Sequence, residues 1–520
     1  MREAISAILS LCLAASVFAG CSSSESSKAG DASAATSDGA VTSVLTEAAT
    51  TAAPEASEPD APPASDTDNT PLNVPQTPLP SFEAVRKQYE DGSAEIKTSL
   101  AALAEEKTAP CINITTQDGK KILSKEKYTA CVIDVFNCEE SYVLNADCGV
   151  KVRGNSTAEQ GDEKPYRIKF EDKYNLLGLH GGKEYKSWVL LRSYWNLAPD
   201  FTAFSLAETI FEGKYYSSDC MYVNLFINGE SRGIYLLCEQ NQAADDRIDV
   251  YEPAPEETGT DIGYAIEMDN YPSEEHPHFY LDHDNASVTD ISGESRRFND
   301  HAYSVKSDIN TKGQLDFINK YTYGAFEILY QAAINKRAMM FDSDYKLVSA
   351  DGTYNSPKEA VEAVFDLESL ANMVILEELV HNNDVGAGSF YMAVDFSPES
   401  RYKKLTFLAP WDFNWAYEGD ADGGYYASTF QKLQHDGYDR SNPWYITAMK
   451  ADWFRDIVKE KWAKFSESGA LKKTTSQVVK ECMKLKNDLG SDSWKIDQAK
   501  NLVKFVNGRI DWLDEQWLSK

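Results

Sequence analysis

The chain has 520 residues, a formal net charge of −31, 42% hydrophobic residues and 12% aromatic residues. This length and composition allow one large two-lobed domain or two ordinary domains with a packed core, together with a tail. The excess of carboxylates argues against nucleic acid or an anionic membrane surface as the main partner, because both require basic patches.

Residues 1–20 resemble the signal peptide of a bacterial lipoprotein. The apolar run Ala4–Ala19 is too short to cross a membrane comfortably, and it ends in small residues directly before Cys21. We therefore expect cleavage before Cys21 and lipidation of its thiol. The mature protein would then be anchored at the cell surface, outside the cell, with the lipid as its contact with the membrane. Plain secretion is the alternative.

The next segment, residues 21–80, contains Ser, Ala, Thr, Asp, Glu and Pro with very few large apolar residues. Such a composition cannot bury enough surface to offset the entropy of ordering the chain, so we expect a disordered tether. Residues 81–110 have helical periodicity, which predicts an amphipathic lead-in helix.

From residue 111 to about 251 the pattern is mostly that of strands, because short β-branched or alternating runs recur. The clearest runs are Ala130–Val135, Gly149–Arg153, Tyr166–Phe170 and Trp188–Leu191. A helix is expected over 201–211. A hairpin is expected next, because Asn228-Gly229 lies between two apolar runs.

Helical patterns dominate after Gln314. Residues 365–380 carry an apolar stripe with Asp366 as a candidate N-cap, and 453–517 also has helical periodicity. Two strands, 390–394 and 405–408, interrupt the helices. The sequence therefore predicts an α+β fold with a strand-rich first half and a helix-rich second half.

Seven cysteines lie outside the leader and Cys21, and no two of them form a CxxC pair, which argues against a structural zinc site. Cys138 and Cys148 could join in a disulfide after export, but buried free thiols fit equally well. A stretch that contains His276, His278 and His283 among acidic residues indicates a solvated surface loop rather than a metal site.

Two aspartates are candidates for chemistry. Asp384 follows the helix that ends near Val380, and Asp412 follows the strand near 405–408. The hairpin between them would bring both to one end, and two nearby carboxylates favour a bound cation or substrate. Phosphoryl transfer requires such a pair, one to orient the hydroxyl and one to hold a metal. The plainer alternative is a turn residue and a helix cap.

A second candidate is the loop between two early strands. Gly154, Asn155 and Ser156 lie at its tip and could donate hydrogen bonds to phosphate oxygens, and Lys169 would point into a cleft from the returning strand. A solvated lysine on an edge strand is the plainer interpretation of Lys169.

Together these pieces resemble the CotH (spore coat protein H) family of atypical kinases, from about residue 148 to 516. The motifs that carry the resemblance follow the family's order: Arg153-Gly154-Asn155-Ser156, Lys164-Pro165-Tyr166-Arg167-Ile168-Lys169, Trp188-Val189-Leu190-Leu191, Val223-Asn224-Leu225-Phe226-Ile227-Asn228-Gly229, Gly233-Ile234-Tyr235-Leu236-Leu237-Cys238-Glu239 and Trp411-Asp412-Phe413-Asn414-Trp415.

The resemblance implies a divergent, two-lobed protein-kinase-like fold, with an N-lobe of about 111–310 and a C-lobe of about 311–520. It implies ATP and Mg²⁺ or Mn²⁺ as cofactors, Asp384 as the catalytic base and Asp412 as a metal ligand. The nucleotide would be contacted by four residues of the first half, and by a fifth near the expected hinge: Arg153, Asn155, Ser156, Lys169 and Glu239.

This chain departs from the family pattern at three points. Asp200-Phe201 stands where many members have Arg-Asn, and Asn414 replaces a frequent Asp. Ser389 takes the place of an Asn that would be the second metal ligand, and it is a poorer donor. Because of these departures, a kinase of weakened activity or a pseudokinase remains an alternative.

We therefore expect an extracellular kinase that transfers the γ-phosphoryl group of ATP to Ser or Thr of proteins on the cell or spore surface, without nucleic acid as a partner. The alternative is a catalytically silent surface or coat scaffold with the same fold. A carbohydrate-associated surface protein is a third hypothesis, although no carbohydrate-binding repeat is visible.

Overall fold

The computed structural model describes residues 68–518, except 76, 155, 160, 162–163, 193–195, 270–271, 273–275, 284–286, 399 and 433–438. The predicted signal peptide, with Cys21, lies outside these residues. The described residues belong to one compact unit. Residues 68–80, which we expected in the tether, are described, and the Leu72 amide donates to the Asn310 carbonyl at 2.9 Å.

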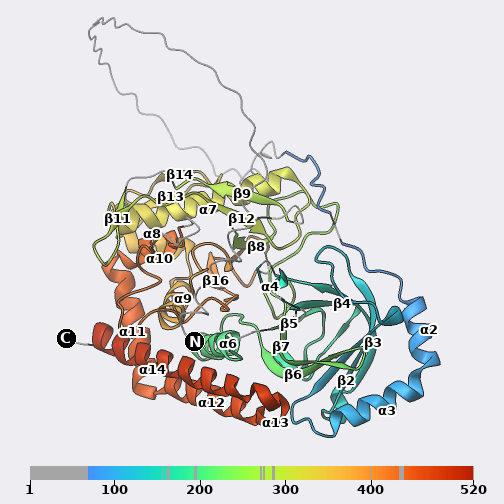
Figure 1. Ribbon diagram of the computed structural model, residues 1–520. Helices are drawn as coiled ribbons and strands as arrows, with labels where there is room; N and C mark the ends of the chain where they lie inside the picture. Colours follow the sequence, from blue (N-terminus) through green and yellow to red (C-terminus); the bar gives the residue numbers. More distant parts are fainter. Residues whose placement is uncertain are drawn as a thin grey trace, which may run out of the picture. The chain divides into compact units, whose positions relative to one another are not determined.

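A closed barrel of seven strands occupies the first half of the described chain (Figure 1). Its strands follow one another in the order β1-β2-β3-β4-β5-β7-β6, and the parallel pair β1 and β6 closes the circle. The strands are β1 (Cys111–Thr116), β2 (Thr129–Phe136), β3 (Leu144–Val152), β4 (Tyr166–Tyr174), β5 (Tyr185–Leu191), β6 (Cys220–Ile227) and β7 (Glu230–Glu239).

Side chains alternate along each strand, so every second side chain points into the barrel interior. On β4, Ile168 and Phe170 are fully buried in the barrel interior, whereas Arg167 and Lys169 lie on the opposite face. The turn between β6 and β7 has φ of 53° at Asn228 and 77° at Gly229, the left-handed values that a tight hairpin needs.

A five-stranded sheet joins the two halves of the chain, in the order β16-β15-β8-β12-β9. Its strands are β8 (Gly263–Met268), β9 (His278–Leu281), β12 (His301–Val305), β15 (Phe390–Asp395) and β16 (Thr406–Leu408). Two small pairs flank it, β10 (Val288–Thr289) with β11 (Ser295–Arg296) and β13 (Met339–Phe341) with β14 (Leu347–Ser349). The late hairpin β15–β16 is therefore anchored on β8 of the first half.

Helices provide most of the second half (Figure 1). They include the buried helix α9, which packs against α6 and α11, while α12 packs against α14. Their bounds are α4 (Ser156–Glu159), α5 (Leu179–Gly182), α6 (Pro199–Phe211), α7 (Lys312–Ala333), α8 (Pro357–Val364), α9 (Leu367–Val380), α10 (Pro443–Met449), α11 (Asp452–Ser468), α12 (Ala470–Lys484), α13 (Lys486–Leu489) and α14 (Lys495–Leu518), with short 3₁₀ turns at Gln117–Gly119, Glu140–Tyr142 and Gly490–Trp494.

The lead-in segment forms two helices, α2 (Glu83–Asp91) and α3 (Ser93–Ala104), with Gly92 between them. They are drawn in blue beside the barrel in Figure 1. Tyr89 of α2 is buried and donates a hydrogen bond to Asp134 of β2 at 2.7 Å. This segment is therefore packed on the outside of the barrel.

The α+β prediction is confirmed, but the closure of the early strands into a barrel was not predicted. The seven described cysteines are free thiols, so of the two alternatives the free thiols hold and Cys138 and Cys148 are not joined. One smaller prediction was wrong. His283 is only 2% exposed and packs on Phe326 at 4.4 Å between ring centroids, so it is not part of a solvated surface. No helix in the described part of the chain is long and apolar enough to span a membrane.

Candidate active site

The loop that follows α9, residues 381–389, carries Asp384 and is called here the Asp384 loop. Helix α9 starts at the predicted cap, where Asp366 accepts a hydrogen bond from the Ser369 amide at 3.1 Å. The Asp384 carbonyl accepts hydrogen bonds from the amides of Ala387 at 2.7 Å and Gly388 at 2.8 Å. Asp384 therefore opens a tight turn, as the plainer interpretation expected, and its carboxylate still projects for other contacts.

Arg440 holds that carboxylate, with Nη1 lying 2.6 Å from Asp384 Oδ1. The Arg440 guanidinium also stacks on the Trp415 ring, 4.4 Å from its centroid. Because the arginine side chain is only 6% exposed, this pair is screened little by water. The contact fixes the direction of the Asp384 carboxylate.

The second aspartate lies in residues 410–415, called here the Asp412 segment. The β15–β16 hairpin ends just before it, and the Asn383 amide donates to the Trp415 carbonyl at 3.2 Å. The predicted convergence of the two segments at one end of the hairpin is therefore present. Asn414 donates a hydrogen bond to the Asp412 carboxylate, and burial raises the pKa of Asp412, which Arg153 and Asn414 oppose.

A third carboxylate, Asp200 at the start of α6, lies beside the Asp412 segment. Its Oδ1 accepts a hydrogen bond from the Phe413 amide at 3.0 Å. Burial raises the pKa of Asp200 to about 7, and the neighbouring Asp412 carboxylate adds to this shift. From the sequence, Asp200 was noted only as part of Asp200-Phe201, which replaces the Arg-Asn of many family members. An acid in the first turn of a helix is ordinary, so nothing in the sequence marked it as buried.

Arg153 faces this carboxylate pair from the barrel. Its guanidinium lies over the Trp411 ring at 5.3 Å, and its charge lowers the pKa of both Asp200 and Asp412. The loop that it opens is tight: Gly154 has φ of 87°, and a Cβ there would lie 2.3 Å from the Thr157 hydroxyl. The structure thus brings Arg153 to the Asp412 segment.

Backbone strain gathers in these segments. Five non-glycine residues between 381 and 417 have left-handed φ, at a cost of about 1–2 kcal/mol for most residue types. They are His381, Ser389, Ala409, Asp412 and Tyr417. Strain that persists in a well-packed region is typical of functional sites, and here it surrounds both candidate aspartates.

The residues present fit a hard divalent cation. Asp412, Asn414 and the adjacent Asp200 offer carboxylate and amide oxygens, and two neighbouring carboxylates, the buried Asp200 and the partly exposed Asp412, favour a cation between them. Mg²⁺ is commonly held by one or two carboxylates together with substrate phosphates and water. Among the described residues no group of three or more His, Cys, Asp and Glu residues is arranged to hold a metal ion.

Lys169 lies on the outer face of β4, next to other cations. Burial lowers the pKa of Lys169, and the positive charges of Arg167, Lys151 and Lys186 lower it further. Within the described part of the chain, neither Arg167 nor Lys169 forms an ion pair or a side-chain hydrogen bond with another residue, and Arg167 Nε is buried.

Glu239 is fully buried and engaged by three donors. Its Oε1 lies 2.8 Å from Arg247 Nε, and its Oε2 lies 2.9 Å from both His180 Nδ1 and the Asp219 amide. The Arg247 guanidinium in turn lies 3.6 Å from the Tyr185 ring centroid. The carboxylate predicted to contact nucleotide is therefore part of an internal ion-pair network.

Three other predicted site residues are only partly accounted for. Asn155 lies outside the described residues, and of Ser156 only the backbone, in α4, is described. Ser389 ends the Asp384 loop with a left-handed φ of 57° directly before β15.

The sheet beside this site carries a cluster that sequence reasoning missed. Lys306 Nζ lies 2.8 Å from Glu267 and 3.4 Å from Asp269, and Tyr391 hydrogen-bonds to Glu267. Burial disfavours the charge on Lys306, but the two carboxylates outweigh it and raise its pKa. These residues come from β8, β15 and the end of β12, whose pairing the sequence does not reveal.

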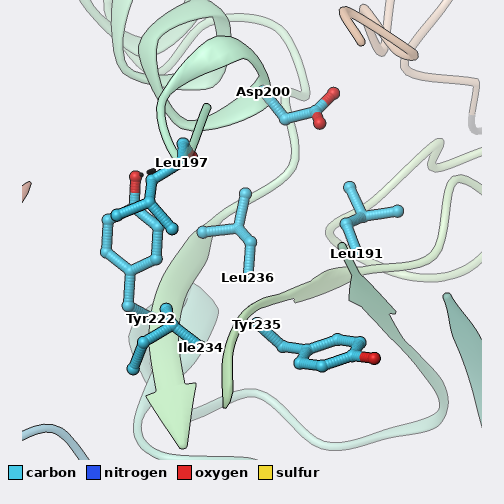
Figure 2. A pocket seen from close by; sticks show the side chains of 7 residues that line it. All are labelled: Leu191, Leu197, Asp200, Tyr222, Ile234, Tyr235 and Leu236. Atoms are coloured by element: carbon cyan, nitrogen blue, oxygen red, sulfur yellow. Dashed lines mark hydrogen bonds between the residues drawn. The ribbon is translucent and has the colours of Figure 1, made fainter. Parts of the chain in front are cut away.

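A small pocket opens between α6 and the barrel strands β5, β6 and β7 (Figure 2). Its lining is apolar or aromatic apart from Asp200: Leu191, Leu197, Tyr222, Ile234, Tyr235 and Leu236. Tyr222 closes one side by donating a hydrogen bond to the Leu197 carbonyl at 2.9 Å. The pocket therefore lies between the start of α6 and three strands of the barrel.

Comparison with known proteins adds one positive finding. Among curated proteins, none matches the chain. The family model described as CotH kinase protein matches residues 150–515, which is more than half of the chain and includes the Asp384 loop, the Asp412 segment, Arg153 and Asp200. The protein therefore belongs to the CotH kinase family.

Proposed function

We propose that this protein is a kinase that transfers the γ-phosphoryl group of ATP to Ser or Thr of surface or coat proteins, with a divergent two-lobed kinase-like fold. The observation that carries the proposal is the convergence of the Asp384 loop with the Asp412 segment. The backbone contact between Asn383 and Trp415 joins them, and the Arg440 side chain contacts both.

The two aspartates have different surroundings, which supports different roles. Asp384 is fixed by Arg440 at the end of a buried helix, so it can accept the proton of an incoming hydroxyl without a change in position. Asp412 has Asn414 and Asp200 as oxygen-bearing neighbours, which suits a metal ligand. A bound Mg²⁺ or Mn²⁺ would neutralise charge on the phosphates.

The cations of the barrel support binding of an anionic substrate. Arg153 faces the Asp412 segment, while Arg167 and Lys169 form no ion pair with another described residue. Charge-assisted contacts to phosphate oxygens would satisfy such side chains. We assign the nucleotide phosphates to this side of the site, with the loop that contains Asn155 and Ser156 next to them.

Calorimetry with Mg²⁺ or Mn²⁺ and a non-hydrolysable ATP analogue tests the binding half of the proposal. Asp412→Asn should weaken metal-dependent binding by about tenfold or more, because an amide is a poor ligand for a hard cation. Asp384→Asn should leave it nearly unchanged, because nucleotide docking does not need the base. If the wild-type protein binds no nucleotide, a catalytically silent surface or coat scaffold replaces the kinase as the better account.

The place of action is part of the proposal. We assign the protein to the outside of the cell, anchored through a lipid on Cys21, where its protein substrates would lie. Cys21→Ser should release the protein from the membrane fraction or leave it unprocessed, and equal retention of the variant would contradict the anchor.

A further inference from the structure

Asp200 is a buried carboxylate that the proposed mechanism does not yet use. It lies in the first turn of α6 and is 7% exposed. A buried acid normally needs an opposite charge or several hydrogen bonds. Among the described residues other than itself, Phe413 alone donates to its carboxylate, at 3.0 Å. This hydrogen bond and one from the backbone of Asp200 itself leave the carboxylate without an opposite charge.

Asp200 also borders a small pocket. Asp200 is one of the residues that line the pocket beside α6, and Figure 2 shows its carboxylate extending from the start of the helix away from Tyr222 and Leu197. The other lining residues are apolar or aromatic, and none of them donates a hydrogen bond to it. A ligand that enters from the Asp412 segment would reach the free side of this group.

The charges around Asp200 favour a cation. Phe413, its hydrogen-bond donor, is the residue next to Asp412, so the two carboxylates lie close together and repel each other. Arg153 is the nearest opposing charge, but it lies over the Trp411 ring and forms no ion pair within 4.0 Å to either aspartate. A divalent cation between the carboxylates would remove the repulsion.

We propose that Asp200 is a second carboxylate ligand of the divalent cation that Asp412 holds. The inference rests on the proposed function and adds to it a metal ligand that the proposed mechanism does not use. Ser389, which we expected as the second ligand, offers only a weak hydroxyl oxygen, whereas Asp200 supplies a charged oxygen next to the Asp412 segment.

Thermal unfolding and calorimetric titration of the full-length protein with MnCl₂ and MgCl₂, with and without ADP, test this inference. In Asp200→Asn the amide oxygen can still accept from the Phe413 amide, but the charge is lost. We expect its Mn²⁺ affinity to fall by about tenfold or more, and most of the metal-dependent rise in Tm to disappear. Without metal its Tm should equal or exceed that of the wild type, because a repulsive charge is gone.

Glu208→Gln is the matched control, because Glu208 is an exposed carboxylate on the same helix. It should leave the metal response unchanged. If Asp412→Asn loses the response while Asp200→Asn retains it, Asp200 serves only to hold the Phe413 amide and the inference is wrong. If Asp200→Asn does not fold, Asp200→Glu replaces it in the test, because it keeps the charge. An Asp200→Glu variant whose Mn²⁺ affinity equals that of Asp200→Ala would then contradict the inference.

If the wild-type protein itself shows no metal response, the proposed function is wrong, and the inference falls with it.

Discussion

At the scale of single residues, the structure separates charges that stabilise the fold from charges that are available for chemistry. Glu239 and Arg247 are both fully buried and pair at 2.8 Å, and further donors saturate the Glu239 carboxylate. By contrast, Arg167 and Lys169 form no ion pair with another described residue, and Phe413 is the one other described residue that donates to the Asp200 carboxylate. Their partners distinguish the two groups, although both contain acidic and basic side chains.

The first prediction concerns Glu239. Glu239→Gln leaves the Arg247 guanidinium buried without its anion, so the free energy of unfolding should fall by about 3–5 kcal/mol. Chemical denaturation measures this change. If stability is unchanged while nucleotide affinity falls, the Glu239 side chain contacts nucleotide as the sequence predicted, and its internal network is unimportant.

The second prediction is a pH dependence that belongs to His180. The hydrogen bond to Glu239 raises the pKa of His180 above 6.5, although burial opposes it. Because the folded state binds the proton more tightly, this contribution to stability is complete below pH 6.5 and is lost as the pH rises through the raised pKa. His180→Gln can still donate to Glu239 without titrating, so its unfolding free energy should change less between pH 6 and about pH 8. Identical pH profiles for both proteins would contradict this assignment.

At the scale of elements, the Asp384 loop depends on close backbone packing. A Cβ at Gly386 would lie 2.0 Å from the Arg440 carbonyl oxygen, so only glycine fits there without a shift of the backbone. Arg440 is the residue that pairs with Asp384, and the shift would therefore reach the ion pair as well. The loop and its arginine form one packed unit.

The third prediction compares two glycines of this loop. Gly386→Ala should lower the free energy of unfolding by about 1–3 kcal/mol through overpacking, and it should impair phosphoryl transfer through the displaced Arg440. Gly388→Ala is the matched control, because its nearest contact would be the Met268 carbonyl oxygen at 3.9 Å. Thermal unfolding of both variants checks this, and equal losses of stability would contradict the packing argument.

Local patterns predicted these elements well, and long-range pairing remained hidden. Asn228-Gly229 indicated its hairpin, and Asp366 indicated the start of α9, because turn and cap chemistry is local. The closure of the barrel depends on β1 pairing with β6, more than a hundred residues apart, for example Ile112 beside Leu225. Nothing in either strand specifies the other as its partner.

At the scale of the whole molecule, the same limit decided which candidate site residues could be predicted from the sequence. Asp384 and Asp412 were found because one hairpin connects them in sequence. Asp200 and Lys306 reach the same region from elements far away in the chain, where an acid in a first helical turn and a lysine after a strand look ordinary. The family match spans both converging segments, and the Asn383–Trp415 backbone contact joins them.

The central claim is phosphoryl transfer at this site, and the most direct test follows label from γ-labelled ATP onto protein, with the purified wild-type protein and Mg²⁺ or Mn²⁺. We expect label to appear with the wild type on itself or on an added surface protein. Asp384→Asn should reduce the rate by about a hundredfold or more while retaining nucleotide binding, because a positioned base is lost. Absence of transfer by the folded wild type with both metals would contradict the account, and so would transfer by Asp384→Asn or Asp412→Asn at the wild-type rate.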